Sequence, residues 1–330
     1  TFHTNGDRIY RISYHANFSN EITLARIPPA FASQLEENFP EMEAFARMYP
    51  RDVSVTVVDT DKQFEIEQAY FADSTITKVF DFDFLQGDEN TAVDQPCSGV
   101  LTEKMAIQLF GNMNCGGKEL RLAGANNFRV TGVIKDWPDQ AHTELTMLVP
   151  YKNMADVEPS YMRDIVLSVL ERNWTASHSY TYVLLRDQLS KAAVDGKFAA
   201  YIDKYGTENI KTKQAFSLFP LKDIHLNSEE GLELKPPASW SRIYLFIGIG
   251  LITLLIACIN FINLTTASSL NRAKEVGVRK VLGAGRSSLV GQFLGESVLL
   301  SFFAFLLSLV LTALAMPTLN ALTELNLVFA

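Results

Sequence analysis

The chain has 330 residues, enough for one large domain or two ordinary ones, and its 48% hydrophobic and 20% charged residues suit a soluble or a partly membrane-embedded protein. The formal net charge is −8, but residues 272–292 alone carry +4, so the rest of the chain carries −12. Three cysteines exclude a disulfide scaffold. Cys258 lies in an apolar run, while Cys97 and Cys115 either form a bridge in an oxidising compartment or remain free buried thiols.

Residues 1–238 are predicted to form an α+β domain. Alternating or β-rich runs indicate strands, and apolar residues three or four apart indicate helices. No predicted strand is followed by a glycine-rich phosphate turn, which argues against a doubly wound sheet. The predicted strands cover residues 8–14, 53–58, 64–70, 128–134 and 180–186, and the predicted helices cover residues 28–38, 103–110 and 190–205.

Two apolar stretches follow, at residues 243–264 and 293–315. Each has about the 20 residues that a helix needs to cross the ~30 Å hydrocarbon layer of a bilayer. The second stretch carries one charge, Glu296, near its start, and it ends before Pro317. Two consecutive runs of this length favour two transmembrane helices over two buried helices of a large soluble protein.

The segment between the two stretches, residues 270–290, contains five basic residues. Lys and Arg close to a span favour the cytoplasmic side of the membrane. Residues 1–238 and residues 317–330 are therefore predicted to lie outside the cytoplasm. A domain of this size can face outward only if another span precedes it, so we expect the chain to be a fragment of a multi-pass protein.

The basic segment is predicted to begin as a short amphipathic helix lying just below the membrane. Glu275 and Arg279 are spaced i,i+4 in the favourable order for an ion pair. Gly283 and Gly285 can break the helix, after which a serine can cap a second helix that leads into the next span. The alternative is a set of ordinary positive-inside charges that rest on anionic lipid.

This segment resembles the cytoplasmic loop of the permease family that includes the macrolide exporter, the lipoprotein-release permeases and the cell-division permease FtsX. In that family a pattern such as R-A-K-E-[IV]-G-[IV]-R-K-x-L-G-A follows the second span, and residues 272–284 match every defined position. Four further segments carry the resemblance: QFLGES at 292–297, and NGDRIYRI at 5–12, VLTEKMAIQLFG at 100–111 and VTGVIKDWP at 130–138, which are similar to Bacteroidetes-type members.

The resemblance implies a multi-pass protein of the bacterial inner membrane. It would have a MacB-like periplasmic core domain with two subdomains, followed by a truncated FtsX-like permease domain at about residues 243–330. The implied partners are a separate ABC ATPase chain, a second permease copy or half, a periplasmic adaptor or envelope partner, and membrane lipid. We expect no nucleic-acid partner, no cofactor and no metal.

By the same resemblance, the basic helix would dock into a groove on the ATPase. Charged faces suit such a contact because they fix register and partner choice more than raw affinity. The expected ATPase-coupling residues are Arg272, Lys274, Glu275, Arg279 and Lys280.

The predicted function is that of a non-catalytic permease subunit, which transmits force from ATP hydrolysis on the partner chain to the periplasmic domain for export or another envelope process. The alternative is a membrane-anchored extracytoplasmic sensor or scaffold without an ATPase. An envelope hydrolase would need a catalytic cluster, but the five histidines are scattered without ligand spacing. The GAGRSS segment at 283–288 lacks the Gly-Lys-Ser/Thr ending of a phosphate loop.

Two charged residues near the second span are predicted to lie at the membrane interface, Arg286 and Glu296. Ionisable groups within a span are functional candidates by default. Because Glu296 lies close to the start of the span, we expect it to make an orienting ion pair with Arg286 or the loop rather than to form a transport site.

Overall fold

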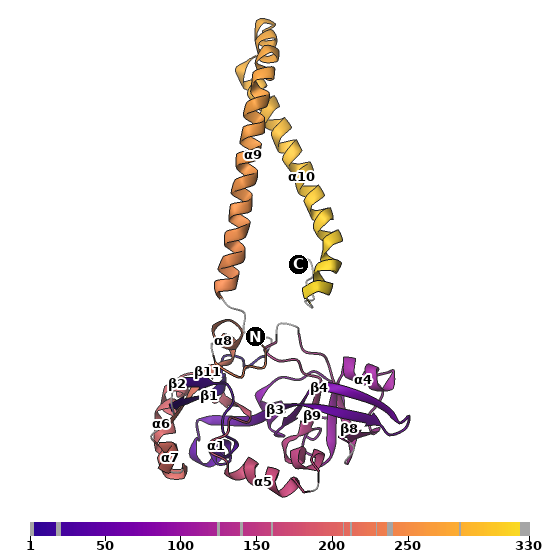
Figure 1. Cartoon of the computed structure of the whole chain (residues 1–330), viewed down its shortest axis with the longest axis vertical. Coiled ribbons are helices and arrows are strands. Elements are labelled where there is room, and N and C mark those ends of the chain that lie inside the picture. The colour runs from indigo at the N-terminus through magenta and orange to yellow at the C-terminus, as the bar shows by residue number, and fades with distance from the viewer. Residues whose placement is uncertain are drawn as a thin grey trace. The chain divides into compact units, whose positions relative to one another are not determined.

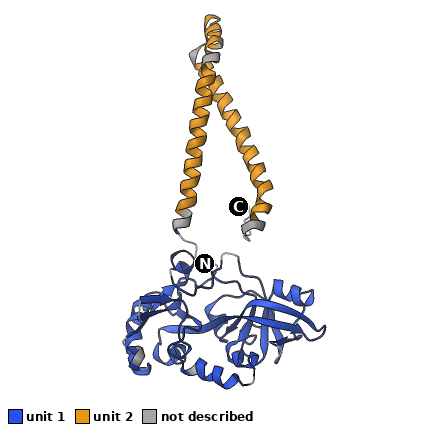
Figure 2. Cartoon of the chain, viewed as in Figure 1, with its two compact units in different colours: residues 1–240 blue, residues 241–330 orange. Residues whose placement is uncertain are grey.

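The computed structural model divides the chain into two compact units, residues 1–240 and residues 241–330 (Figure 2). The structure describes residues 3–17, 21–123, 126–138, 141–159, 161–206, 208–211, 213–228, 230–235, 240–283 and 285–323.

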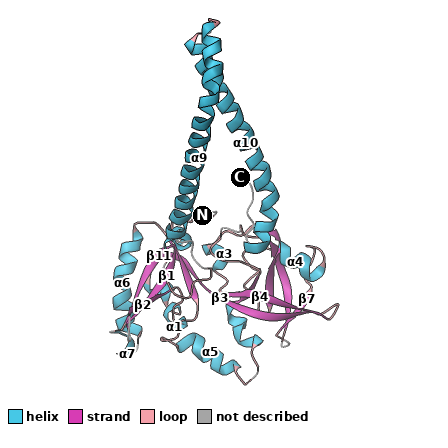
Figure 3. Cartoon of the chain, turned by 45° about the horizontal axis from the view of Figure 1, so that its top comes forward, coloured by secondary structure: helices cyan, strands magenta, loops and turns pink. Residues whose placement is uncertain are grey.

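The first unit mixes strands and short helices, as the α+β prediction requires (Figure 3). The strands are β1 (Ile9–Asn17), β2 (Glu21–Leu24), β3 (Met42–Val57), β4 (Lys62–Ala72), β5 (Phe84–Gln86), β6 (Ser98–Thr102), β7 (Glu119–Leu122), β8 (Asn127–Ile134), β9 (Met147–Pro150), β10 (Tyr180–Leu185) and β11 (Gln214–Pro220). The helices are α1 (Pro29–Ala32), α2 (Leu35–Asn38), α3 (Ile76–Val79), α4 (Glu103–Phe110), the 3₁₀ helix η1 (Tyr151–Val157), α5 (Arg163–Arg172), α6 (Ser190–Tyr205), α7 (Glu208–Lys211) and α8 (Leu221–Asn227).

Six strands pair in a ring that runs β3–β4–β9–β6–β8–β7 and returns to β3. Val53, Val55 and Val57 alternate along β3, because side chains on one face of a strand recur every two residues. All three are buried in one apolar cluster with residues from the other five strands of the ring. We call this part of the unit the barrel lobe.

Helix α4 packs on the barrel lobe through Met105, Ala106 and Leu109. Its first turn is capped by Thr102, whose Oγ1 accepts a hydrogen bond from the Met105 N–H at 3.3 Å. Its last turn ends at Gly111, which has a φ of 76° that favours glycine. The helix predicted at 103–110 is therefore confirmed.

Strands β11, β1 and β10, with the first half of β3, form the second lobe, and β2 pairs with β1. Its core is aromatic: the Phe31 ring of α1 stacks on the Phe216 ring of β11 with centroids 3.9 Å apart, and Phe198 of α6 lies 5.6 Å from Phe31. We call this part the aromatic lobe. Figure 1 shows α6 and α1 beside its strands.

Strand β3 belongs to both lobes. Ala46 in its first half pairs with Tyr182 of β10, and Val55 in its second half pairs with Leu122 of β7. The two predicted subdomains are consequently two lobes of one continuous sheet. The sequence predicted a strand only at 53–58, and Pro50 lies inside the longer strand, where the register shifts between Arg51 and Val53.

The helix predicted at 28–38 is wrong in its continuity, because the structure divides it into α1 and α2. Gln34, between them, has a φ of −129° that is not helical. The Ser33 hydroxyl and the Ser33 N–H both donate to the Ala30 carbonyl oxygen, at 2.7 and 3.3 Å, where α1 ends.

The second unit consists of α9 (Trp240–Val281, which begins at the last residue of the first unit) and α10 (Arg286–Thr323). Both helices are long and apolar enough to cross a membrane, at Tyr244–Ser269 and Ser287–Asn320, and neither apolar window is buried within the described part of the chain. Two expectations need correction. The basic segment is not a separate short helix but the continuation of α9, and α10 passes through Pro317 to Thr323.

Candidate functional site

The predicted coupling segment is about the last three turns of α9, followed by a turn and the start of α10. Lys274 and Lys280 are exposed on α9, and Arg279 is partly buried. The side chains of Arg272 and Glu275 lie outside the described residues, so the predicted pair of Glu275 with Arg279 stays a prediction.

The turn between the helices ends α9 through two backbone hydrogen bonds. The Leu282 N–H donates to the Val278 oxygen and the Gly283 N–H donates to the Lys280 oxygen, both at 3.1 Å. Gly283 has a φ of 96°, a conformation that other residues rarely adopt, and a Cβ added at this position would have no heavy atom within 4 Å. Backbone conformation, and not lack of space, is therefore the reason for glycine at this position.

A side-chain hydrogen bond joins the two helices across this turn. Arg279 Nη1 donates to Gln292 Oε1 at 2.8 Å. The two residues belong to the two separate motifs at 272–284 and 292–297, so the structure brings these motifs together. Leu289, on the intervening turn of α10, is only 9% exposed.

Glu296 follows Gln292 by one turn on α10. Arg286 begins the same continuous helix, and its side chain lies outside the described residues. Ten positions of α-helix correspond to a rise of about 15 Å along α10. The predicted ion pair of Glu296 with Arg286 or the loop stays a prediction, as does an interface position for both residues.

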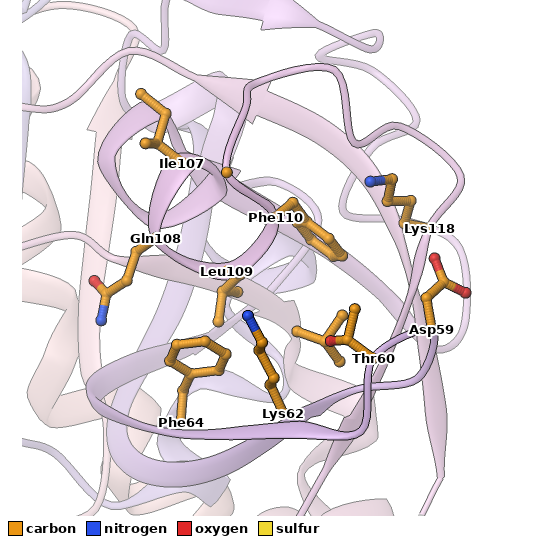
Figure 4. Close-up of a pocket in the computed structure, with 11 residues that line it drawn as sticks. Asp59, Thr60, Lys62, Phe64, Ile107, Gln108, Leu109, Phe110 and Lys118 are labelled. Atoms are coloured by element: carbon orange, nitrogen blue, oxygen red, sulfur yellow. The ribbon is translucent and has the colours of Figure 1, made fainter.

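The barrel lobe has a shallow pocket of about 270 Å³ between the β3–β4 turn and the end of α4 (Figure 4). Lys118 Nζ lies 4.8 Å from the centroid of the Phe110 ring, and Lys62 extends over the apolar side chains of Phe64 and Leu109. Asp59 also lines the pocket, so charges of both signs surround its apolar floor. It contains no histidine or cysteine.

His3 and His142 both lie beside the Phe80 ring, with ring centroids 5.0 and 6.1 Å away. Burial lowers the pKa of His142 to about 3, and its Nε2 lies 2.8 Å from the Tyr182 hydroxyl. Burial also lowers the pKa values of His3 and His178 to about 4. His3 Nδ1 accepts from the Asp81 N–H at 3.2 Å. Among the described residues no group of three or more His, Cys, Asp or Glu side chains could hold a metal ion.

All three cysteines are free thiols, which decides the alternative left open for Cys97 and Cys115. Burial raises the pKa of both of these thiols. Asn153 Nδ2 lies 3.7 Å from the Cys97 sulfur. Both cysteines contact the apolar core of the barrel lobe.

One buried ionic group was missed from the sequence. Arg11 of β1 is 0% exposed and binds Glu230 and Glu233, more than 200 residues further along the chain. The available signal was a single arginine inside a strand whose neighbours Ile9, Tyr10 and Ile12 are apolar.

Two family models match the chain. The MacB-like periplasmic core domain matches residues 1–201, and the FtsX-like permease C-terminal model matches residues 247–330. The first covers more than half of the chain and most of the first unit, up to residue 201. The second covers α10 and most of α9, including the coupling segment.

Curated relatives agree with these matches. The macrolide export ATP-binding/permease protein MacB of Bdellovibrio bacteriovorus is 26% identical over 218 residues, which cover 64% of this chain and 30% of the relative. The ABC transporter permease YknZ of Bacillus subtilis is 24% identical over 231 residues, which cover 69% of this chain and 49% of the relative. The chain thus spans half or less of the length of these relatives.

A solved domain of a permease protein from Porphyromonas gingivalis has the same fold, with a TM-score of 0.58 at 19% identity over 72% of this chain and 96% of that domain. With the two apolar helices, these matches indicate a membrane protein with a periplasmic domain, and they confirm the resemblance seen in the coupling segment. The chain belongs to the family of MacB-like periplasmic core domains, joined here to an FtsX-like permease segment of an ABC transporter.

Proposed function

We propose that this permease couples ATP hydrolysis on a separate ATPase chain to movement of its periplasmic domain, in the bacterial inner membrane, and that it catalyses no reaction itself. The observation that carries the proposal is the continuity of α9. Its 42 residues include both the apolar stretch Tyr244–Ser269 and the basic end with Lys274, Arg279 and Lys280. A helix of this length is about 63 Å long, so a displacement at the basic end moves the whole element.

The distribution of charge supports a cytoplasmic position for the basic end of α9. Residues 272–292 carry +4 whereas the rest of the chain carries −12. Basic residues next to a span favour the cytoplasmic side, where an ATPase has access to ATP. Arg272, Lys274, Glu275, Arg279 and Lys280 are the proposed ATPase-coupling residues, while Arg286 and Glu296 are proposed to lie at the membrane interface.

The exposed apolar helices support further partners. Leu254, Leu299 and Phe303 are about 60% exposed in the described chain. Such side chains need lipid or other helices around them. A second permease copy or half is the proposed helix partner. A periplasmic adaptor or envelope protein is the proposed partner of the domain.

The test is to express the full-length gene with the ABC ATPase gene beside it and to purify the permease in lipid nanodiscs. For the double variant Arg279→Glu, Lys280→Glu we expect co-purified ATPase to fall at least tenfold, because two of the basic charges of the docking face are reversed. The matched control is Lys104→Glu, Lys135→Glu, which reverses two exposed lysines of the domain and should leave the ATPase bound.

A further variant separates the effect of charge on ATPase docking from the effect of the hydrogen bond across the turn between α9 and α10. Gln292→Leu removes the hydrogen bond to Arg279 but leaves every charge, so we expect a smaller loss of ATPase than with the charge reversal. Unchanged co-purification in the double variant would refute the docking role. Complete absence of an associated ATPase from the unmodified protein would favour the sensor or scaffold alternative.

A further inference from the structure

The segment before α9 is attached to strand β1 by a buried arginine. Arg11 donates from Nη1 to Glu233 Oε2 at 2.6 Å, and from Nη2 to Glu233 Oε1 at 2.5 Å and Glu230 Oε2 at 2.8 Å. The side chain of Arg11 is 0% exposed, and those of Glu230 and Glu233 are 6% and 7% exposed. We call these three residues the arginine clasp.

Two hydroxyl groups complete the hydrogen bonding of the two carboxylates, whereas the buried Arg11 Nε has no hydrogen-bond partner among the described residues. Ser13 Oγ donates to Glu230 Oε1, and Ser228 Oγ donates to Glu233 Oε1. Each of the four carboxylate oxygens therefore has a donor. Burial alone would lower the pKa of Arg11, but the hydrogen bond to Glu233 and the nearby carboxylates raise it overall. The guanidinium accordingly stays charged and its fork of donors stays directed at both carboxylates.

Backbone contacts hold the same segment. The Ala25 N–H donates to the Gly231 oxygen at 3.0 Å and the Gly231 N–H donates to the Thr23 oxygen at 2.9 Å, so Gly231 pairs with Leu24 at the end of β2 in a parallel bridge. The Tyr180 hydroxyl of β10 donates to the Leu232 oxygen. A Cβ at position 231 would lie 2.8 Å from Leu24 Cδ2, so glycine permits this close approach.

Strand β1 connects the clasp to the rest of the sheet. Its position 11 pairs with Tyr182 of β10 on one side and with Phe219 of β11 on the other. A pull on Glu233 is therefore applied at the centre of the aromatic lobe rather than at an edge. In sequence, only six residues separate Glu233 from Trp240, where α9 begins.

We infer that the arginine clasp is the joint through which movement of α9 enters the periplasmic domain, with Arg11 as its positioning residue. This inference rests on the proposed function, because that function supplies the movement. A buried ion group contributes little net stability compared with apolar packing of similar volume, whereas removal of one partner is costly. The ion group differs from apolar packing in being directional. Its paired charge-assisted hydrogen bonds resist sliding of the segment along β1, whereas apolar contacts do not.

The test is to pull on the joint in the full-length permease, held in nanodiscs. Handles are attached at Leu189→Cys, a 90% exposed site in the domain, and at Tyr244→Cys in the first turns of α9, with the three native cysteines replaced. In the unmodified clasp we expect the segment at 228–235 to detach in one step at high force. Its eight residues would add at most about 29 Å of extension.

The clasp variant is Arg11→Met, Glu230→Leu, Glu233→Leu, which replaces the charges by apolar groups and so keeps the lobe folded. We expect the detachment force to fall at least twofold, and Glu233→Gln alone to give an intermediate force. The matched control is Arg47→Met, Asp73→Leu, which removes another two-bond ion pair of the same sheet, at 2.9 Å, that does not contact this segment.

The detachment force separates a joint from general stabilisation. If the clasp only stabilises the fold, its replacement lowers the melting temperature and leaves the force of the first detachment step unchanged. That result would overturn the inference. An equal loss of detachment force in the control variant would also overturn it. ATPase co-purification is measured on the same variants and should be unaffected. If no ATPase co-purifies with the unmodified protein, the result contradicts the proposed function. If the detachment force does not depend on the clasp residues, the result contradicts the role of the clasp as a joint.

Discussion

Leucines in the two units have contrasting surroundings. Leu101, in the barrel lobe, is 0% exposed, whereas Leu254 of α9 is 60% exposed. In the domain, the chain covers its own apolar groups with strands and short helices. In the apolar windows of α9 and α10 the described chain does not bury leucines such as Leu254, as expected for side chains that face lipid or another helix. Exposure of an apolar side chain therefore has a different meaning in each unit.

The largest expected effect comes from truncating one leucine in each unit and comparing the free energies of unfolding. We expect Leu101→Ala to lower the free energy of unfolding of the domain by about 2–5 kcal/mol, since it leaves a cavity in a closed core. Leu254→Ala should leave the domain's stability unchanged. Chemical denaturation of the full-length protein in detergent, followed by tryptophan fluorescence, measures both. An equal loss in the two variants would mean that the domain and α9 unfold as one unit.

The pH dependence of the domain sharpens the comparison further. The folded pKa values of His142 (about 3) and His3 (about 4) lie below the ordinary value of 6.5. The unfolded state thus binds more protons between pH 6.5 and about 4, so stability is complete above pH 6.5 and falls as the pH drops through this window. Each histidine contributes at most about 1.4 kcal/mol per pH unit there.

His142→Gln tests this expectation, because glutamine can keep a hydrogen bond to Tyr182 without titrating in this range. Thermal melts at pH 7, 5.5 and 4 should show a shallower loss of stability for the variant than for the unmodified domain. Parallel curves would show that His142 is not buried as a neutral group. The apolar stretches of α9 and α10 contain no histidine and should not add to the slope.

The cysteines give the smallest expected effect. Cys97 and Cys115 are free in the domain, as is Cys258 in α9. Reductant should therefore leave the melting temperature unchanged, and alkylation under denaturing conditions without reductant should modify all three thiols. Peptide mass mapping checks this result. A linked peptide containing Cys97 and Cys115 would contradict it.

Several elements were predicted from local pattern alone. The helices at 103–110 and 190–205 match α4 and α6 at both ends, because the spacing of their apolar residues is a local property of each segment. The continuation of α9 through the basic segment was not predicted. Its charged residues suggested a change of element, but they fit an α-helix as well as the apolar residues before them, and the helix ends only at the turn that contains Gly283.

The sequence by itself determined the composition of the two units, the two apolar stretches and the basic segment with its two motifs, since each depends on residues that are close along the chain. Tertiary structure alone decided the closure of the six-stranded ring, the sharing of β3 by both lobes and the hydrogen bond of Arg279 to Gln292. It also decided the arginine clasp, whose partners Arg11 and Glu233 are 222 positions apart. Strand pairing and buried ion pairs depend on which segments meet in space, and no local pattern encodes that meeting.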